Sequence, residues 1–139
     1  MNSLGLQNKK LSIIIPVYFN EESIDELYNR IQKISVNLPE LEIIFVDDGS
    51  KDGSLDKIKE LSSKDVCVTG IKLSRNFGSF NACLASLTYC TGTCTVIMSA
   101  DLQDPPELIE DFVKTWEDGA KVIIGVRANR GDPINQRTA

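Results

Sequence analysis

The stretch MSADLQDPPE, residues 98–107, places two aspartates and a glutamine directly after a run of apolar residues. If the backbone stays extended past Met98, the side chains of Ser99, Asp101 and Gln103 point to one side, about 7 Å apart at each step. Hard divalent cations such as Mg²⁺ or Mn²⁺ prefer oxygen ligands, and they commonly share one or two protein carboxylates with substrate phosphates. The stretch therefore indicates a cation held between the protein and a diphosphate.

Asp104 in the same stretch has a different expected role. The sequence Asp-Pro-Pro-Glu is a complete helix start, because Asp104 can cap, Pro105 fits the first turn and Glu107 supports the free amides. We therefore interpret Asp104 as a helix cap. Asp101 has no comparable helix to cap, so we favour ligand binding over a turn role for it.

The elements that position these residues follow from hydrophobic periodicity. Short apolar runs alternate with longer stretches of helical period, and strands are expected at residues 11–17, 41–46, 66–73, 94–98 and 121–126. This alternation predicts an α/β fold in which parallel strands carry helices on both faces. Ligands of such open sheets bind beyond the carboxyl ends of the strands, and the polar clusters of this sequence follow the strands at that edge.

Helix boundaries are indicated by capping and stop residues. Asn20 is the expected cap of the first helix, and Gly92 and Gly119 are the expected stops of the third and fourth. The third helix is expected to turn four side chains toward the sheet, namely Phe80, Cys83, Leu84 and Leu87.

Composition limits the class of protein. A chain of 139 residues with 42% hydrophobic and 25% charged side chains is suited to one compact domain. Its net charge of −5, from 15 basic and 20 acidic residues, argues against general nucleic-acid binding, because duplex phosphates require a basic face. The four cysteines form no CxxC pair and the sequence has no histidine, so we expect buried free thiols, a reducing cytoplasmic compartment and no zinc site.

Membrane and targeting signals are weak in the printed sequence. No apolar run approaches the roughly 20 residues that a membrane helix needs, and MNSLGLQNKK lacks the apolar centre of a signal peptide. We expect these residues to form a soluble domain, with any membrane contact made by segments outside this sequence.

Four motifs resemble those of a known family. SIIIPVYFNEE, IIFVDDGSKDGS, LSRNFG and SADLQDPPE, in this order, are similar to motifs of inverting family 2 glycosyltransferases with a GT-A fold. The resemblance covers about residues 11–130 and is nearest to the branch of dolichyl-phosphate mannose synthase and bacterial polyprenyl-phosphate glycosyltransferases. It implies a Rossmann-like α/β/α sandwich with a mainly parallel central sheet. Residues 1–10 would be an N-terminal tail, 11–127 the nucleotide-sugar-binding GT-A domain, and 128–139 the truncated start of an acceptor-side segment.

The resemblance also implies an activity. A sugar would pass, with inversion at the anomeric carbon, from a nucleoside diphosphate sugar to an acceptor. The implied acceptor is a polyprenyl phosphate or a glycan, in cell-envelope glycan synthesis, and the domain would be cytoplasmic, at the inner face of the cell membrane. We expect the sequence to be part of a longer protein that carries the acceptor half and the membrane helices.

The family motifs imply a nucleotide site on particular residues. The residues implied to line the base are Pro16, Val17, Tyr18 and Glu22. Two more, Arg75 and Asp101, are implied to lie near the nucleotide, with a solvated loop arginine as the alternative for Arg75.

The double aspartate after the second strand is the other part of this implied site. Either Asp47 or Asp48 would accept a hydrogen bond from the polar edge of the base, and a charge-assisted bond of this kind is specific. The alternative for DDGSKDGS is a turn that leads into a capped helix, and Asp52 and Ser54 are assigned only that role.

In this family the cation is held by a DxD motif followed by xQ. Asp101 and Gln103 match the motif, and Ser99 replaces its first aspartate. The resemblance thus implies Mg²⁺ or Mn²⁺ on Asp101 and Gln103, held less tightly because a serine hydroxyl is a weak, neutral ligand. Arg127 and Arg130 resemble the basic pair that meets the lipid phosphate acceptor, with a solvated basic tail as the alternative. No residue is assigned as the catalytic base.

Three alternatives predict other sequence features. A dinucleotide-binding domain requires GxGxxG after the first strand, where this sequence reads PVYFNEE. A receiver-like domain requires acids after the first and third strands and a lysine after the fifth, where Arg127 stands. A non-catalytic nucleotide-sugar-binding module, or an inactive fragment of such an enzyme, is consistent with Ser99 and is the stronger alternative.

Overall fold

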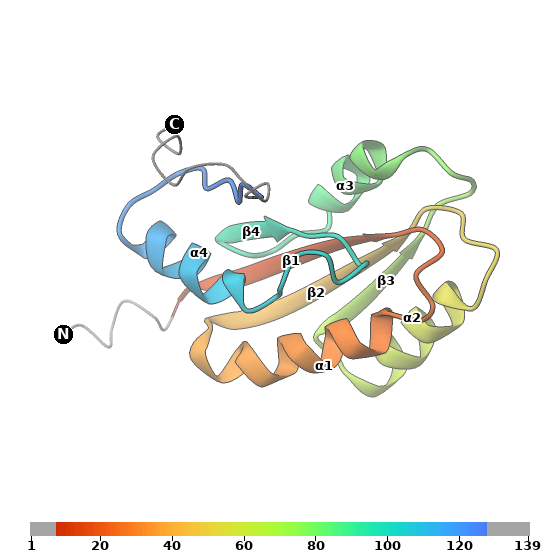
Figure 1. Ribbon diagram of the computed structural model, residues 1–139, viewed down its shortest axis with the longest axis horizontal. Coiled ribbons are helices and arrows are strands. Elements are labelled where there is room, and N and C mark those ends of the chain that lie inside the picture. Colours follow the sequence, from red (N-terminus) through yellow and green to blue (C-terminus); the bar gives the residue numbers. More distant parts are fainter. Residues whose placement is uncertain (1–7, 128–139) are drawn as a thin grey trace.

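The computed structural model describes residues 8–127 and contains a four-stranded parallel sheet with helices on both faces (Figure 1). The strands are β1 (Lys10–Val17), β2 (Glu40–Asp47), β3 (Val68–Lys72) and β4 (Cys94–Ile97), and their order across the sheet is β3-β2-β1-β4. β1 lies inside the sheet, where it pairs in parallel with both β2 and β4. The expected α/β fold with a mainly parallel sheet is therefore confirmed.

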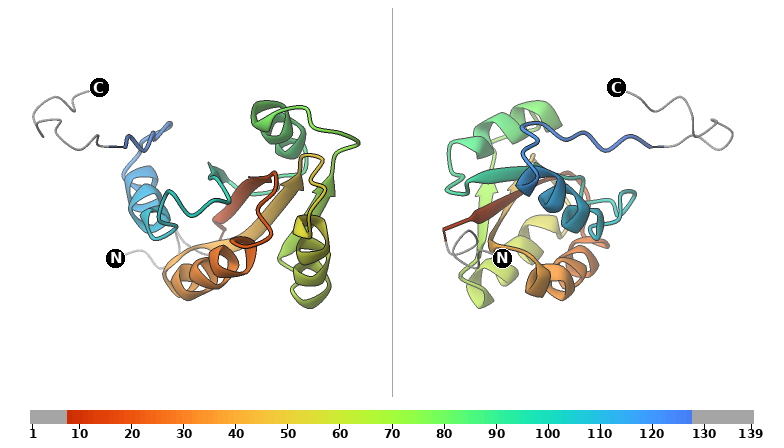
Figure 2. Two further views of the ribbon diagram at one scale, coloured as in Figure 1. Left: turned by 45° about the vertical axis from the view of Figure 1, so that its right-hand side comes forward. Right: turned by 90° about the vertical axis from the view of Figure 1, so that its left-hand side faces the viewer.

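Helices cover the two faces of the sheet unequally (Figure 2). α1 (Ile24–Ile34), α2 (Ser54–Lys64) and α4 (Leu108–Glu117) pack on one face and α3 (Ser79–Leu87) on the other, while a short 3-10 turn, η2 (Ser35–Asn37), follows α1. Because both faces of β1 are covered, residues 11–15 are fully buried whichever way they point. None of the helices within residues 8–127 has the length and apolar character needed to cross a membrane.

The expected strand at residues 121–126 is not formed, and this prediction was wrong for the described part of the chain. Val122, Ile124 and Val126 are 80%, 77% and 76% exposed. A short run of β-branched apolar residues gives a segment strand propensity, but a strand also needs a neighbour that completes its ladder. Here two cavities of about 580 and 570 Å³ lie between β4, α4 and residues 121–127, and β4 pairs only with β1 among the strands of residues 8–127.

α3 is rotated about its axis relative to the sequence-based expectation. Its buried residues are the small Ala82 and Ser86, whereas Phe80, Leu84 and Leu87 are 73%, 48% and 43% exposed. Small side chains let the helix approach the sheet closely, and the buried hydroxyl of Ser86 is satisfied because it donates to the carbonyl oxygen of Ala82 at 2.8 Å. The predicted inward face was wrong for the three large residues.

Two expected helix caps are not used as caps. α1 begins further along the chain than Asn20, and the Asn20 side chain instead accepts the backbone N–H of Tyr18 at 2.9 Å. α4 begins beyond Asp104, whose carboxylate pairs with Arg127. In both places a turn separates the predicted cap from its helix, so another partner satisfies the side chain.

The two glycines predicted to stop helices have different roles. Gly119 does end α4, because its φ is 110° and its N–H donates to the carbonyl oxygen of Trp116 at 2.9 Å. α3 already ends at Leu87, well before Gly92. A Cβ at Gly92 would lie 2.5 Å from the Oγ of Ser12 and 2.7 Å from its backbone nitrogen, so this glycine lets the loop before β4 approach β1.

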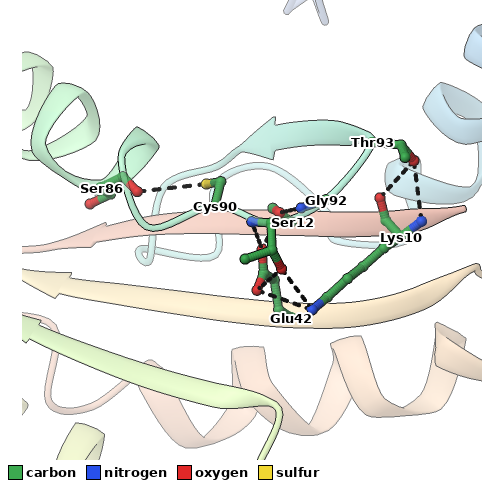
Figure 3. A network of polar contacts seen from close by, with 8 residues as sticks. Lys10, Ser12, Glu42, Ser86, Cys90, Gly92 and Thr93 are labelled. Carbon is green, nitrogen blue, oxygen red and sulfur yellow. Dashed lines mark hydrogen bonds and ion pairs between the residues drawn. The ribbon is translucent and has the colours of Figure 1, made fainter.

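A polar network fastens that loop to the amino-terminal parts of β1 and β2 (Figure 3). Glu42 accepts hydrogen bonds from the hydroxyl of Ser12 and from the N–H and hydroxyl of Thr91, and the ammonium group of Lys10 lies 3.4 Å away. The N–H of Gly92 donates to the Oγ of Ser12 at 2.9 Å. Burial raises the pKa of Glu42, but these hydrogen bonds and the Lys10 charge outweigh burial and lower the pKa to about 2.

Candidate functional site

A pocket of about 360 Å³ opens beyond the carboxyl ends of the strands. It is lined by Pro16, Val17, Tyr18, Asn20, Asp48, Asn76, Gly78, Ser79, Ser99 and Asp101. The loops after β1, β2, β3 and β4 therefore meet at one place, as expected for an open parallel sheet. The residues of the implied nucleotide site that line it are Pro16, Val17, Tyr18, Asp48 and Asp101.

The turn after β1 is held mainly by side chains of the turn after β2. The backbone N–H groups of residues 18–21 donate in order to side-chain oxygens of Asn20, Ser50, Ser54 and Asp52, at 2.9, 3.0, 2.9 and 3.4 Å. Backbone amides lose their strand partners where β1 ends, so these side chains satisfy groups that the sheet cannot. The position of Tyr18 at the pocket is a consequence of this bonding.

The turn after β2 is held by hydrogen bonds from its backbone to Glu21 and Asp52. The N–H of Gly53 donates to the carboxylate of Glu21 at 2.8 Å, and Asp52 accepts the N–H of Ser54 at 3.0 Å. Burial raises the pKa of Asp52, but its hydrogen bonds from Ser54 and from the N–H of Glu21 outweigh burial and lower the pKa. Glu21 therefore connects the two turns, whereas Glu22 is exposed and does not line the pocket.

The two aspartates after β2 lie in different environments. Asp48 lines the pocket, is 2% exposed, and accepts the N–H of Phe77 at 2.7 Å through its Oδ1. Asp47 is 1% exposed and does not line the pocket, and its Oδ1 is buried without a hydrogen-bond partner among residues 8–127. Sequence reasoning left the choice between them open, and the structure brings Asp48 to the pocket.

The loop after β3 and the first residue of α3 supply three lining residues that sequence reasoning did not assign, namely Asn76, Gly78 and Ser79. The motif LSRNFG contains the first two, so their place after a strand was the available signal. Arg75 of the same motif does not line the pocket. Its guanidinium group lies over the ring of Phe77, 4.0 Å from the ring centroid, in a cation-π contact.

The chain does not remain extended after β4. The Oδ1 of Asp101 accepts the N–H of Gln103 at 3.0 Å, and Leu102 between them has a φ of 61°. This local bond favours a turn over a continued strand, so the expected alignment of the three oxygen ligands was wrong. Ser99 and Asp101 line the pocket, whereas Gln103 lines the neighbouring cavity of about 570 Å³.

The oxygen donors of the pocket suit a hard cation. Asp48 and Asp101 supply carboxylates and Ser99 supplies a hydroxyl. In the part of the chain that the structure describes, no three His, Cys, Asp or Glu side chains are grouped so that they could hold a metal ion. These residues therefore fit Mg²⁺ or Mn²⁺ only as a shared site, in which phosphate or water oxygens complete the coordination.

Arg127 lies at the neighbouring cavity rather than at the pocket. Its Nε is 2.8 Å from Oδ1 of Asp104 and its Nη2 is 3.1 Å from Oδ2, which is a bidentate contact. Hydrogen bonding by Arg127 lowers the pKa of Asp104. The Arg127 side chain is 61% exposed. Arg130, the other implied acceptor-phosphate residue, lies outside the described residues.

The cysteines are free thiols, but the expectation that they are buried was wrong. Cys67 is exposed, and the other three are only partly buried. Burial raises the pKa of the Cys83 and Cys94 thiols. A raised pKa disfavours the thiolate, so these two side chains are suited to packing rather than to nucleophilic chemistry.

Comparison with known proteins extends these observations. The family model described as glycosyl transferase family 2 matches residues 12–139 of this sequence. The chain belongs to this family. The match includes the carboxyl ends of all four strands and every residue that lines the pocket, so the resemblance found in the motifs is confirmed. The enzyme class expected of the family is glycosyltransferase.

Two curated relatives carry names of this class. An uncharacterized glycosyltransferase of Bacillus subtilis (strain 168), YkcC, is 42% identical over 120 residues, which are 86% of this chain and 37% of the relative. An undecaprenyl-phosphate 4-deoxy-4-formamido-L-arabinose transferase of Serratia proteamaculans (strain 568) is 39% identical over 133 residues, which are 94% of this chain and 41% of the relative. The chain therefore spans about two fifths of the length of these relatives.

A solved structure confirms the GT-A fold. The crystal structure of S. aureus TarS 1-349 in complex with UDP is similar with a TM-score of 0.65 and 26% sequence identity. The similarity covers 78% of this chain and 32% of that chain. The four-stranded parallel unit thus corresponds to one part of a larger protein of this fold.

Proposed function

We propose that residues 11–127 form the nucleotide-sugar-binding domain of an inverting glycosyltransferase, which transfers a sugar from a nucleoside diphosphate sugar to an acceptor. The observation that carries the proposal is the meeting of Tyr18, Asp48 and Asp101 at one pocket. An aromatic ring and two carboxylates suit a nucleotide base, its N–H groups and a cation-bound diphosphate. The UDP bound by TarS and the name of the Serratia relative support the same class of reaction.

The base is assigned to the part of the pocket formed by Pro16, Val17 and Tyr18, with Asp48 as the acceptor for its N–H groups. The bond from the N–H of Phe77 orients the Asp48 carboxylate before a ligand arrives. Arg75 does not line the pocket, but it is exposed and directly precedes the lining residue Asn76, so we keep it as a proposed nucleotide contact. Glu22 and Asp47 stand outside the pocket, and we assign them no contact with the ligand.

A divalent cation, Mg²⁺ or Mn²⁺, is assigned to Asp101, with Ser99 as a weak additional donor. When bound, such an ion stabilises the negative charge that develops on a departing diphosphate. Asp101 is already oriented, because it accepts the N–H of Gln103. Gln103 itself lies at the neighbouring cavity, so the proposal gives Asp101 the principal role.

For the acceptor we propose a lipid phosphate, the class named in the Serratia relative, with Arg127 and Arg130 as its contacts. Arg127 would exchange the Asp104 carboxylate for a phosphate, which a planar guanidinium group binds in the same bidentate manner. A lipid phosphate is already an anion, so the reaction requires no general base to activate it. This acceptor would place the enzyme in cell-envelope glycan synthesis, at the inner face of the cell membrane.

The test is a titration of UDP and GDP, each with and without Mn²⁺, followed by an assay of sugar release from nucleotide sugars with the same bases. We expect one nucleotide to bind more tightly with Mn²⁺, and Asp101→Asn to weaken that binding about tenfold. Asp111→Asn is the matched control, since it neutralises an exposed carboxylate on α4 and should leave binding unchanged. Absence of binding by both nucleotides would overturn the proposal.

A non-catalytic nucleotide-sugar-binding module is the second candidate. It is favoured by Ser99, which stands where the family motif has its first aspartate. This candidate predicts nucleotide-sugar binding that depends on Mn²⁺ and is not followed by sugar release. Turnover by the full natural protein with a lipid phosphate acceptor would exclude it.

A further inference from the structure

Phe19 has a backbone conformation that is rare for a bulky residue. Its φ is 55°, and among the described residues only Phe19 and Leu102 have a positive φ without being glycine. This region crowds the Cβ atom against the backbone, so such residues persist only where surrounding contacts hold them. Both are next to residues that line the pocket, Phe19 between Tyr18 and Asn20 and Leu102 beside Asp101.

The conformation of Phe19 is held by another turn of the chain. Its N–H donates to the Oγ of Ser50 at 3.0 Å, and the N–H of Asn20 donates to the Oγ of Ser54 at 2.9 Å. Ser54 is fully buried at the start of α2, so its hydroxyl is a fixed acceptor. The strained backbone is therefore held by tertiary contacts with Ser50 and Ser54.

This backbone sets the position of the Phe19 ring. The ring packs edge-on against the ring of Tyr18, with 4.6 Å between centroids and 85° between planes. The two side chains are 49% and 50% exposed, so the contact is not part of the hydrophobic core. Tyr18 lines the pocket and Phe19 does not, so Phe19 can influence a ligand there only through Tyr18. Edge-to-face contacts are directional, and they restrict the orientation of the partner ring.

We propose that Phe19 is a positioning residue that orients the Tyr18 ring at the pocket before a ligand binds. The inference rests on the proposed function, in which Tyr18 lies against the nucleotide base. A half-exposed tyrosine without this contact samples several rotamers and loses that freedom when it binds a ligand. Phe19 restricts the ring beforehand, so it increases the affinity for the nucleotide without touching it.

The first test is a double-mutant cycle on the affinity for UDP and GDP, with Phe19→Leu, Tyr18→Leu and the double variant. Phe19→Leu should weaken binding of the preferred nucleotide about 3- to 10-fold, and Phe19→Tyr, which keeps a ring, should restore most of the affinity. In the Tyr18→Leu background the effect of Phe19→Leu should vanish, because the ring that it positions is gone. An equal effect in both backgrounds, or none in either, overturns the inference.

Phe19→Gly separates the ring from the backbone strain, because glycine adopts a positive φ without penalty. It should weaken nucleotide binding as much as Phe19→Leu does while the protein unfolds at the same or a higher denaturant concentration. Weaker binding that follows loss of stability would assign Phe19 a structural role and contradict the inference.

A second measurement observes the Tyr18 ring directly by NMR of the protein with labelled tyrosine rings. The Tyr18 signals should shift in Phe19→Leu, and they should not shift in Phe80→Leu, which removes another exposed phenylalanine at the start of α3. If the natural protein binds nucleotide but the Tyr18 signals are the same in Phe19→Leu, the inference fails and the proposed function stands. If the natural protein binds neither nucleotide, both fail.

Discussion

The Oδ1 atom of Asp48 accepts the backbone N–H of Phe77 at 2.7 Å, and this bond connects the end of β2 to the loop that leads into α3. Asp48 is 2% exposed and forms part of the pocket wall. The same loop brings Asn76, Gly78 and the first residue of α3, Ser79, to that pocket. One carboxylate therefore both lines the pocket and positions other residues that line it.

Substitution of Asp48 should separate these two roles. Asp48→Ala should lower the free energy of unfolding by about 1–3 kcal/mol, because it leaves the N–H of Phe77 without its partner. Asp48→Asn keeps an acceptor oxygen and should retain most of the stability, but the lost charge should weaken nucleotide binding about tenfold. Urea denaturation and titration calorimetry measure the two effects. An alanine variant as stable as the natural protein would show that the bond does not contribute to stability.

Gly92 should be far less tolerant of a side chain than Gly119. Gly92→Ala should lower the free energy of unfolding by about 2–4 kcal/mol, because the new Cβ would meet the backbone and hydroxyl of Ser12 and displace the loop before β4. Gly119→Ala is the control, since it has open space but a φ of 110°, and it should cost only about 1 kcal/mol. Equal losses in urea denaturation would argue against the close approach at Gly92.

The strands and the binding edge of the sheet could be predicted from the sequence because their signals are local. Strands covered on both faces are short continuous apolar runs, and the runs at 11–17 and 41–46 correspond to β1 and β2 within one residue at each end. A parallel sheet then brings its carboxyl ends together whatever the details of the loops. The places of Tyr18, Asp48 and Asp101 at one pocket follow from this topology.

Features that depend on contacts between distant segments could not be predicted in this way. Asp104 pairs with Arg127 and does not cap α4, and Arg127 follows α4 in the sequence. The orientation of α3 was decided by how closely Ala82 and Ser86 approach the sheet, and hydrophobic periodicity alone does not measure that distance. Residues 121–126 have the pattern of a strand, but their state depends on a pairing partner, which no local pattern supplies.

The free energy of unfolding should depend on the charge of Glu42 between pH 4.5 and pH 2. Its pKa is about 2 in the folded protein and 4.5 ordinarily, so the carboxylate stabilises the fold above pH 4.5 and loses this contribution as the pH falls toward 2. The side chain is 15% exposed, and we expect the loss to be about 1–3 kcal/mol. Urea denaturation between pH 6 and pH 2.5 should show a shallower pH dependence for Glu42→Gln than for the natural protein. Parallel curves would contradict the lowered pKa.

The ion pair between Asp104 and Arg127 should limit the access of a phosphate to the arginine and should contribute little to stability. Both side chains are substantially exposed, so Asp104→Asn should leave the urea midpoint nearly unchanged. The substitution removes the carboxylate that occupies the guanidinium group. The proposed acceptor role therefore predicts that Asp104→Asn strengthens the binding of a polyprenyl phosphate in detergent micelles and that Arg127→Gln weakens it.

The pH dependence of that binding provides a further check on the pair. Arg127 lowers the pKa of Asp104, so the pair persists in mildly acidic solution and opens only as the pH falls below the ordinary aspartate pKa of 3.8. Between pH 7 and pH 5 the natural protein should therefore bind lipid phosphate more weakly than Asp104→Asn does. Added salt should reduce this difference in affinity. Equal binding by the two proteins throughout this range would mean that Asp104 does not compete with the phosphate for Arg127.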